Sequence, residues 1–299
     1  MAMYKDFDEI AVRARELGPK RVAILFPDDA AVMRATAEGM REGLISPVLI
    51  GEKAHIEAVA KEAHLPIEDV EVNDQSDPQG AANLCLDMVI RGEVSFVVKG
   101  NILTTYLYRA LIRATRQLAP DQTPCTLCFH QAPGINKIFV ITDPGVNILP
   151  DLTTKKQILA NAIQVLRSLG CDTPRIMALA AMHLDGKPSI VADHADRLKS
   201  MADKGRFGKC TMETGTTLLE FFDGNREKAE TFPDLFLVPN IEAGNILVKT
   251  IDHLIGGIRQ CVTVGAGLIA LTPSRSDGYK ARTRNLALGL VLAESSRRR

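Results

Sequence analysis

Features that would direct a chain to nucleic acid or to a membrane are scarce in this sequence. There is no tryptophan, aromatic residues make up 5% of the chain, and Lys plus Arg equals Asp plus Glu at 36 each, so the formal net charge is zero. Nucleic-acid and membrane-surface proteins usually carry a basic excess. No stretch approaches the roughly 18 consecutive apolar residues of a membrane span. The sequence therefore predicts no nucleic-acid partner and no membrane partner.

The start of the chain also lacks an export signal. The stretch MAMYKDFDEIAVRAREL carries charges throughout, whereas a signal peptide has an apolar core and a small-residue cleavage site. We therefore expect a cytoplasmic location. The composition, 46% hydrophobic and 24% charged, is that of an ordinary globular protein, and 299 residues suffice for two domains, each with its own core.

Short β-branched runs alternate with helical patterns along nearly the whole sequence. RVAILFP at 21–27 precedes a stretch in which Ala31, Met33, Ala37 and Met40 recur at helical spacing. SFVVKG at 95–100 precedes the helical pattern TTYLYRALIRATRQL. This alternation predicts an α/β protein with parallel sheets that helices cover on both faces.

The alternation is interrupted over residues 124–144. There the apolar runs PCTLCFH and NKIFVIT are joined by QAPGI, a pattern typical of a hairpin. We place a domain boundary at this break and expect the helical last segment to pack back on the first domain. The expected domains are residues 1–128 plus 270–299, and residues 129–269.

Parallel sheets bind ligands at the carboxyl ends of their strands, so polar residues that follow apolar runs are candidate site residues. Lys99 and Gly100 end one run, Thr104 follows, and Arg109 lies on the ensuing helix. A lysine, a flexible glycine backbone, a hydroxyl and helix N–H groups suit an anion such as phosphate. A simpler interpretation is a strand end with a threonine helix cap and a solvated lysine.

Two later runs are followed by polar groups as well. Asp143 follows KIFVIT and begins the sequence Asp-Pro-Gly-x-Asn, which is also ordinary turn chemistry. Glu242 and Asn245 follow LFLVPN, and Lys249 lies one helical turn further along. Asn245 can cap that helix. A cap alone does not require the glutamate, so we favour a binding role.

The most specific stretch is LTPSRSDG at 271–278. Arg275 presents a forked donor that suits a phosphate, and Ser274 can donate a hydroxyl hydrogen bond. Asp277 can accept a proton from an attacking group or cap the final helix. Three further cations on that helix can extend a cationic site: Lys280, Arg282 and Arg284.

Two motifs lack the context that their function needs. Gly265-Ala-Gly267 matches a dinucleotide fingerprint, but the sequence runs on as an apolar strand to a proline instead of opening a helix. Cys125 and Cys128 have the spacing of zinc ligands, but no second pair exists, so a buried strand is predicted. We expect no metal site and no cofactor.

Taken in order, four segments resemble the phosphate acetyltransferase/phosphate butyryltransferase family, with the Ser-Arg-Ser-Asp motif closer to the butyryl branch. They are KGNILTT, TDPGVNILPDLTTKKQILANAIQVLRSLG, PNIEAGNILVK and TPSRSDG. The resemblance implies a fold like isocitrate and isopropylmalate dehydrogenases, with two α/β domains around a cleft, in a homodimer or higher homo-oligomer. It implies reversible transfer of a short or branched acyl group between coenzyme A and inorganic phosphate, with coenzyme A as substrate.

The resemblance also implies roles for the candidate residues. Ser274 and Arg275 match the pair expected to bind the acyl phosphate and steady charge at the reacting carbonyl, and Asp277 matches the acidic residue that is our candidate base for the thiol. Other candidates match positions that line the cleft: Lys99 and Thr104 in the first domain, and Asp143, Glu242, Asn245 and Lys249 in the second. Arg109 stays a candidate only because of its place on the helix after Lys99.

The sequence departs from the family pattern at three places. Cys125-Thr126 stands where the family usually has Ser-His, His183 where an acidic residue is common, and residues 214–219 read TGTTLL where Gly-Pro-Leu-x-x-Asp is expected. These departures keep open a non-catalytic homologue that binds coenzyme A or phosphate. An NAD-dependent dehydrogenase of the same fold is a third alternative, which the lack of a convincing set of metal-binding carboxylates disfavours.

Overall fold

The computed structural model describes residues 4–181, 189–215 and 232–297 of the chain. It is an α/β protein, and its internal contacts divide into two compact units. The N-terminal unit comprises Asp8–Pro124 and Gln260–Arg299, and the central unit comprises Cys125–Arg259 together with residues 4–7. These borders differ from the expected 128/129 and 269/270. At the second border, residues 262–265 form a hairpin with the strand that follows them, in the N-terminal unit.

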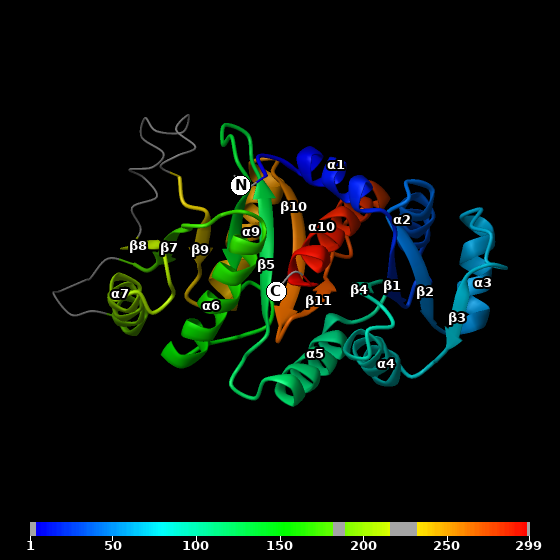
Figure 1. Cartoon of the computed structure of the whole chain (residues 1–299), viewed down its shortest axis with the longest axis horizontal. Coiled ribbons are helices and arrows are strands. Elements are labelled where there is room, and N and C mark those ends of the chain that lie inside the picture. The colour runs from blue at the N-terminus through cyan, green and yellow to red at the C-terminus, as the bar shows by residue number, and fades with distance from the viewer. Residues whose placement is uncertain (1–3, 182–188, 216–231, 298–299) are drawn as a thin grey trace. The chain divides into compact units, whose positions relative to one another are not determined.

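In the N-terminal unit, strands and helices alternate as the sequence predicts (Figure 1). The strand order is β3-β2-β1-β4-β11-β10, in which only β10 and β11 pair antiparallel. The strands are β1 (Lys20–Leu25), β2 (Ile45–Gly51), β3 (Glu71–Asp74), β4 (Val97–Lys99), β10 (Ile258–Gly265) and β11 (Leu268–Leu271). The helices are α1 (Phe7–Leu17), α2 (Ala30–Arg41), α3 (Lys53–Glu62), α4 (Pro78–Ile90), α5 (Thr104–Leu118) and α10 (Tyr279–Arg297).

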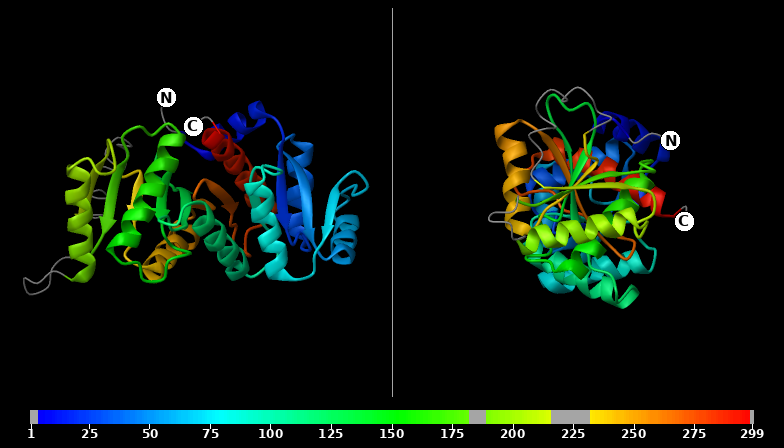
Figure 2. Two further views of the ribbon diagram at one scale, coloured as in Figure 1. Left: turned by 60° about the horizontal axis from the view of Figure 1, so that its bottom comes forward. Right: turned by 90° about the vertical axis from the view of Figure 1, so that its left-hand side faces the viewer.

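Helices cover the two faces of these strands. Alternate strand residues such as Ala23, Leu25 and Val97 are buried with residues of α4 and α5, which lie side by side in both views of the unit (Figures 1 and 2). α2 and α10 pack together, so closely that a Cβ on Gly39 would lie 2.6 Å from Leu286. α10 contacts β11, so the last helix packs within the N-terminal unit.

In the central unit the strand order is β5-β6-β9-β7-β8. β5 and β6 pair antiparallel, which confirms the hairpin predicted over 124–144, and the remaining pairs are parallel. The strands are β5 (Cys125–Gln131), β6 (Phe139–Thr142), β7 (Arg175–Leu179), β8 (Thr211–Gly215) and β9 (Leu235–Leu237). The helices described here are α6 (Leu152–Ser168), α7 (Ile190–Asp203) and α9 (Ile241–Leu254).

The strand registers set where the candidate residues lie. Leu25, the last residue of β1, pairs with Lys99 at the end of β4, and Leu271 at the end of β11 pairs with Val98. Because the three strands are parallel, the segments that follow them emerge at one edge of the sheet. None of the described helices combines the length and apolar character that crossing a membrane requires.

Candidate functional site

The N-terminal unit brings Lys99 to the carboxyl edge of its sheet as a buried cation. Lys99 is the last residue of β4 and is 1% exposed. Its Nζ atom donates to the carbonyl oxygen of Gly100 at 3.2 Å. The pKa of Lys99 is lowered to about 8, chiefly by burial and further by the charges of Arg282 and Arg275, while Asp277 opposes the decrease. The lysine therefore lies within electrostatic reach of the segment 275–282, far away in the sequence.

Gly100 is fixed by the backbone of the neighbouring strand end. A Cβ at this position would lie 2.1 Å from the carbonyl oxygen of Phe26 and 2.4 Å from that of Leu25. The backbone nitrogen of Gly100 donates to Leu25 and that of Asn101 donates to Phe26, both at 2.8 Å. The glycine lets the two strand ends approach closely, which holds Lys99 beside the β1 loop.

The loop after β11 is closed by its own hydrogen bonds. Oδ2 of Asp277 accepts from the backbone nitrogen of Ser274 at 2.7 Å, and the backbone nitrogen of Asp277 donates to the carbonyl oxygen of Ser274 at 3.1 Å. The hydroxyl oxygens of Ser274 and Ser276 lie 3.0 Å apart. Ser274 and Asp277 are half-buried, whereas the Arg275 side chain is exposed. The loop thus presents a guanidinium and a hydroxyl from a turn that its own hydrogen bonds close.

Of the three candidate cations near the start of α10, only Arg282 is buried, at 6% exposure; Lys280 and Arg284 are exposed. Nε of Arg282 donates to the carbonyl oxygen of Asp277 at 2.9 Å and Nη2 to that of Ser274 at 3.0 Å. Nη1 approaches the carbonyl oxygen of Lys99 at 3.5 Å. Arg282 therefore contacts both the Ser274–Asp277 loop and the end of β4. Its position on the helix alone did not indicate this role.

Thr104 and Arg109 lie on α5, which follows Lys99. Thr104 is the first helical residue, and Leu103 before it occupies the cap position without a side-chain hydrogen bond to the helix. The interpretation of Thr104 as a helix cap is therefore wrong. Thr104 is half-buried and Arg109 is exposed further along the helix. Their binding roles stay predictions.

Asp28 directly follows the β1 run but was not among the predicted site residues. The side chain is half-buried, and burial raises its pKa, while hydrogen bonds from its own backbone and from Asn101 oppose the increase. Asp29 beside it accepts from the backbone nitrogens of Ala31 and Val32 at the start of α2. The rule that polar residues after strands are candidates, applied to this run, would have found Asp28.

In the central unit, Asp143 organises the loop after β6. Its Oδ1 accepts from the backbone nitrogens of Thr126, Gly145 and Val146, and its Oδ2 accepts from the backbone and side-chain nitrogens of Asn147. The residue is 3% exposed. Burial raises its pKa, and these hydrogen bonds oppose the increase. The carboxylate is thus committed to its own loop, which suits a positioning role better than direct ligand contact.

The start of α9 packs against this loop. A Cβ on Gly244 would lie 2.9 Å from Cα of Pro144, so only glycine lets the helix come this close. The helix cap is Asn240, whose side chain accepts from the backbone nitrogen of Ala243 at 2.9 Å. The alternative interpretation of Asn245 as the helix cap is therefore wrong. Glu242, Asn245 and Lys249 are exposed, and their spacing places them on one face of α9.

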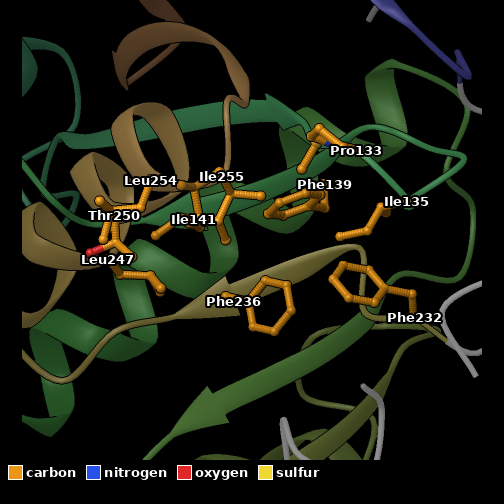
Figure 3. A pocket seen from close by; sticks show the side chains of 12 residues that line it. Pro133, Ile135, Phe139, Ile141, Phe232, Phe236, Leu247, Thr250, Leu254 and Ile255 are labelled. Carbon is orange, nitrogen blue, oxygen red and sulfur yellow. The ribbon is translucent and has the colours of Figure 1, made fainter. Parts of the chain in front are cut away.

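A separate apolar pocket of about 410 Å³ lies in the central unit (Figure 3). Phe139, Phe232 and Phe236 point into it, and the second half of α9 contributes Leu247 and Leu254. Phe139 begins β6, whereas Asp143 follows the end of that strand. Ile141 of the same strand also lines the pocket, and the lining contains no titratable side chain.

The structure describes some of the positions at which the sequence departs from the family pattern. Cys125 is fully buried in β5 as predicted, and burial raises the pKa of its thiol. Thr126 donates its backbone nitrogen to Asp143, and its carbonyl oxygen accepts from the Thr142 hydroxyl at 2.9 Å. Thr214 and Gly215 end β8; His183 and residues 216–219 lie outside the described residues. Within the described ranges, no group of three His, Cys, Asp or Glu residues is arranged to hold a metal ion.

No protein-family model matches the chain. It is 24% identical to a phosphate butyryltransferase of Clostridium beijerinckii, with 97% of this chain and 99% of the relative covered. It is 26% identical to a phosphate acetyltransferase of Rickettsia felis, with 93% and 82% covered.

Solved structures share the fold. A branched-chain phosphotransacylase from Enterococcus faecalis superposes with a TM-score of 0.71 at 18% identity, covering 91% of this chain and 99% of that one. A 4-hydroxythreonine-4-phosphate dehydrogenase from Klebsiella pneumoniae superposes with a TM-score of 0.61 at 14% identity, covering 92% and 98%. In sequence, and over nearly its whole length, the chain is thus similar to phosphate butyryltransferases and phosphate acetyltransferases, the family that its motifs resemble.

Proposed function

We propose that this chain is a phosphate acyltransferase that moves an acyl group reversibly between coenzyme A and inorganic phosphate. One observation carries the proposal: in a chain that aligns end to end with phosphate acyltransferases, Lys99 and the Ser274–Asp277 loop meet at the carboxyl edge of one parallel sheet. Two cations and a hydroxyl there suit a phosphate leaving group and a developing oxyanion.

In the direction of acyl-CoA synthesis, the coenzyme A sulfur attacks the carbonyl carbon of an acyl phosphate. The thiol proton passes to Asp277, a carbon–sulfur bond forms, and the tetrahedral oxyanion accepts a hydrogen bond from Ser274. The carbon–oxygen bond to phosphate then breaks, and phosphate leaves with its charge held by Arg275 and Lys99. Asp277 returns the proton to the departing phosphate, so the enzyme ends the cycle unchanged.

The finer features of the proposal follow from the resemblance. We assign a short or branched acyl substrate, because the Ser-Arg-Ser-Asp motif matches the butyryl branch. We assign Glu242, Asn245 and Lys249, with the loop that Asp143 organises, to substrate binding, and we propose a fold of the isocitrate dehydrogenase type. We also propose a cytoplasmic homodimer or higher homo-oligomer that needs no cofactor.

A non-catalytic homologue that binds coenzyme A or phosphate is the second candidate. The observation that favours it is Cys125-Thr126 in place of the family's Ser-His pair, with both residues buried in β5. A dehydrogenase of this fold receives less support, since the likeness to Klebsiella pneumoniae 4-hydroxythreonine-4-phosphate dehydrogenase extends to the fold alone.

The proposal is tested by the release of free thiol from acetyl-, butyryl- and isobutyryl-CoA, with and without phosphate. We expect phosphate-dependent thiol release, matched by an equal amount of acyl phosphate trapped as its hydroxamate. Calorimetric binding of coenzyme A without turnover on any acyl group would favour the binding homologue. Reduction of NAD with a hydroxy-acid phosphate would favour the dehydrogenase.

A further inference from the structure

We propose that Arg282 is a positioning residue that ties the Ser274–Asp277 loop to the end of β4 and so assembles the anion site. The inference rests on the proposed function, because it assigns Arg282 a role in that reaction. Arg282 does not touch the substrate in this account. It acts through the backbone of the residues that do.

The geometry of the guanidinium supports this role. Two donors reach carbonyl oxygens at the two ends of the loop, Ser274 at 3.0 Å and Asp277 at 2.9 Å, and a third approaches the carbonyl oxygen of Lys99 at 3.5 Å. The fixed fork of an arginine directs donors from three separate nitrogens to acceptors that lie apart. A lysine has a single nitrogen there and can satisfy fewer of the three carbonyls.

The surroundings of Arg282 keep this fork in place. The side chain is 6% exposed, and its neighbours Val32, Thr36 and Val98 come from α2 and β4. Burial lowers its pKa, and the carboxylates of Asp277 and Asp29 oppose that decrease. A buried cation held by carbonyl dipoles is costly to leave unpaired, which favours a single loop conformation.

Arg282 also adjusts the charge of the site. The charged groups that face Lys99 are Arg282 from α10, with Arg275 and Asp277 from the preceding loop; Asp29, on the loop after β1, faces Arg282. Among these charges, Arg282 has the largest effect on the pKa of Lys99, which it lowers. Removing Arg282 should therefore raise the pKa of Lys99, an effect that a purely structural residue would not have.

The test compares Arg282→Gln and Arg282→Lys in the full chain, with Arg116→Gln, an exposed arginine of α5, as the matched control. Misplacing a catalytic group by about 1 Å costs roughly a hundredfold. We expect Arg282→Gln to lower kcat/KM for phosphate by about that factor and to raise the pKa of Lys99, followed by NMR of lysine-labelled protein. Arg282→Lys should retain the lowered pKa of Lys99 but still lose kcat/KM, while Arg116→Gln matches the wild type.

Circular dichroism and thermal melting identify any variant that fails to fold. If Arg282→Gln fails to fold, Arg282→Lys still tests the inference, because an unchanged kcat/KM in that variant would contradict the positioning role. Unchanged kcat/KM in folded Arg282→Gln, or an unchanged Lys99 pKa in it, would overturn the inference. Absence of turnover by the wild type on every acyl-CoA would instead overturn the proposed function, because the titration of Lys99 needs no turnover.

Discussion

Oδ2 of Asp277 lies 2.7 Å from the backbone nitrogen of Ser274, and the backbone nitrogen of Asp277 donates in return to the carbonyl oxygen of Ser274. The carboxylate that we assign as the base therefore also closes the loop that carries Ser274 and Arg275. A substitution of Asp277 can affect proton transfer, loop geometry or both. A replacement of Asp277 that keeps the hydrogen bond to Ser274 but cannot take up a proton separates the two roles.

Asp277→Asn is that replacement, since its amide oxygen can still accept from Ser274. General base catalysis contributes about 10²–10⁴-fold, so we expect kcat to fall by at least about a hundredfold while KM for phosphate changes little. Steady-state kinetics, with Asp277→Ala as the comparison that loses both roles, provides the measurement. Near-normal kcat in Asp277→Asn would leave Asp277 with the loop-closing role only.

Arg275→Ala removes the exposed guanidinium at the tip of the loop. Loss of one donor to a transition-state oxyanion costs about 10²–10³ in kcat, and we expect a loss in this range with a weaker apparent affinity for phosphate. Arg275→Lys should recover only part of the activity, because a lysine cannot form the bidentate contact. Turnover within a few fold of the wild type in Arg275→Ala would remove Arg275 from the site.

The lowered pKa of Lys99 predicts a pH dependence of anion binding. Lys99 is an ammonium below its pKa of about 8 and loses that charge as the pH rises through this value. Sulfate affinity, measured as competitive inhibition against phosphate or by calorimetry, should therefore be highest below pH 8 and fall above it. Sulfate keeps its charge over this range, unlike phosphate. This fall in sulfate affinity with pH should disappear in Lys99→Met. A sulfate affinity that does not change with pH in the wild type would contradict the assignment of Lys99 to the anion site.

The alternation of strands and helices, the hairpin after residue 124 and the final helix could be predicted because local periodicity determines them. The same holds for the segment after Gly265, where Ala266 and Gly267 adopt φ of 51° and 79° in a tight turn from β10 to β11. A hairpin here excludes the helix that a dinucleotide fingerprint needs.

Roles that depend on packing could not be predicted in this way. In the sequence, Lys280, Arg282 and Arg284 are equivalent cations. In the structure Arg282 is the buried one of the three, because α10 packs on α2. The sequence indicated Asn245 as a possible cap of α9, but the backbone places Asn240 at the cap position. Aspartate is common in turns, so the sequence alone does not distinguish Asp143 from an ordinary turn residue. Its five hydrogen bonds are seen only in the folded loop.

Gly100→Ala should destabilise the N-terminal unit. The new methyl would lie 2.1 Å from the carbonyl oxygen of Phe26, which belongs to the backbone and cannot rotate away. Overpacking of this kind costs about 1–3 kcal/mol, and we expect the upper end of that range in urea unfolding. Gly278→Ala is the steric control, because a Cβ there meets nothing within 4 Å. Equal stabilities of the two variants would contradict the close approach.

Asp143→Asn should destabilise the central unit, because an amide nitrogen would face donors that now share a carboxylate. Leaving buried donors unsatisfied costs about 1–3 kcal/mol each, so we expect a loss of about 3 kcal/mol in denaturant unfolding. The matched control is Asp151→Asn, since Asp151 is an exposed cap of α6 and asparagine caps a helix equally well. A loss no larger than that of Asp151→Asn would show that Asp143 does not hold its loop.

The most direct test is the position of an anion in a crystal soaked with selenate, an oxyanion of phosphate-like shape whose selenium scatters anomalously. If Lys99, Ser274 and Arg275 form one site, the selenium peak lies within hydrogen-bonding reach of the Arg275 guanidinium and the Lys99 ammonium, and it is lost in Arg275→Ala. Selenate bound only at other cationic surfaces, with the wild type and Arg275→Ala giving the same peaks, would contradict the account.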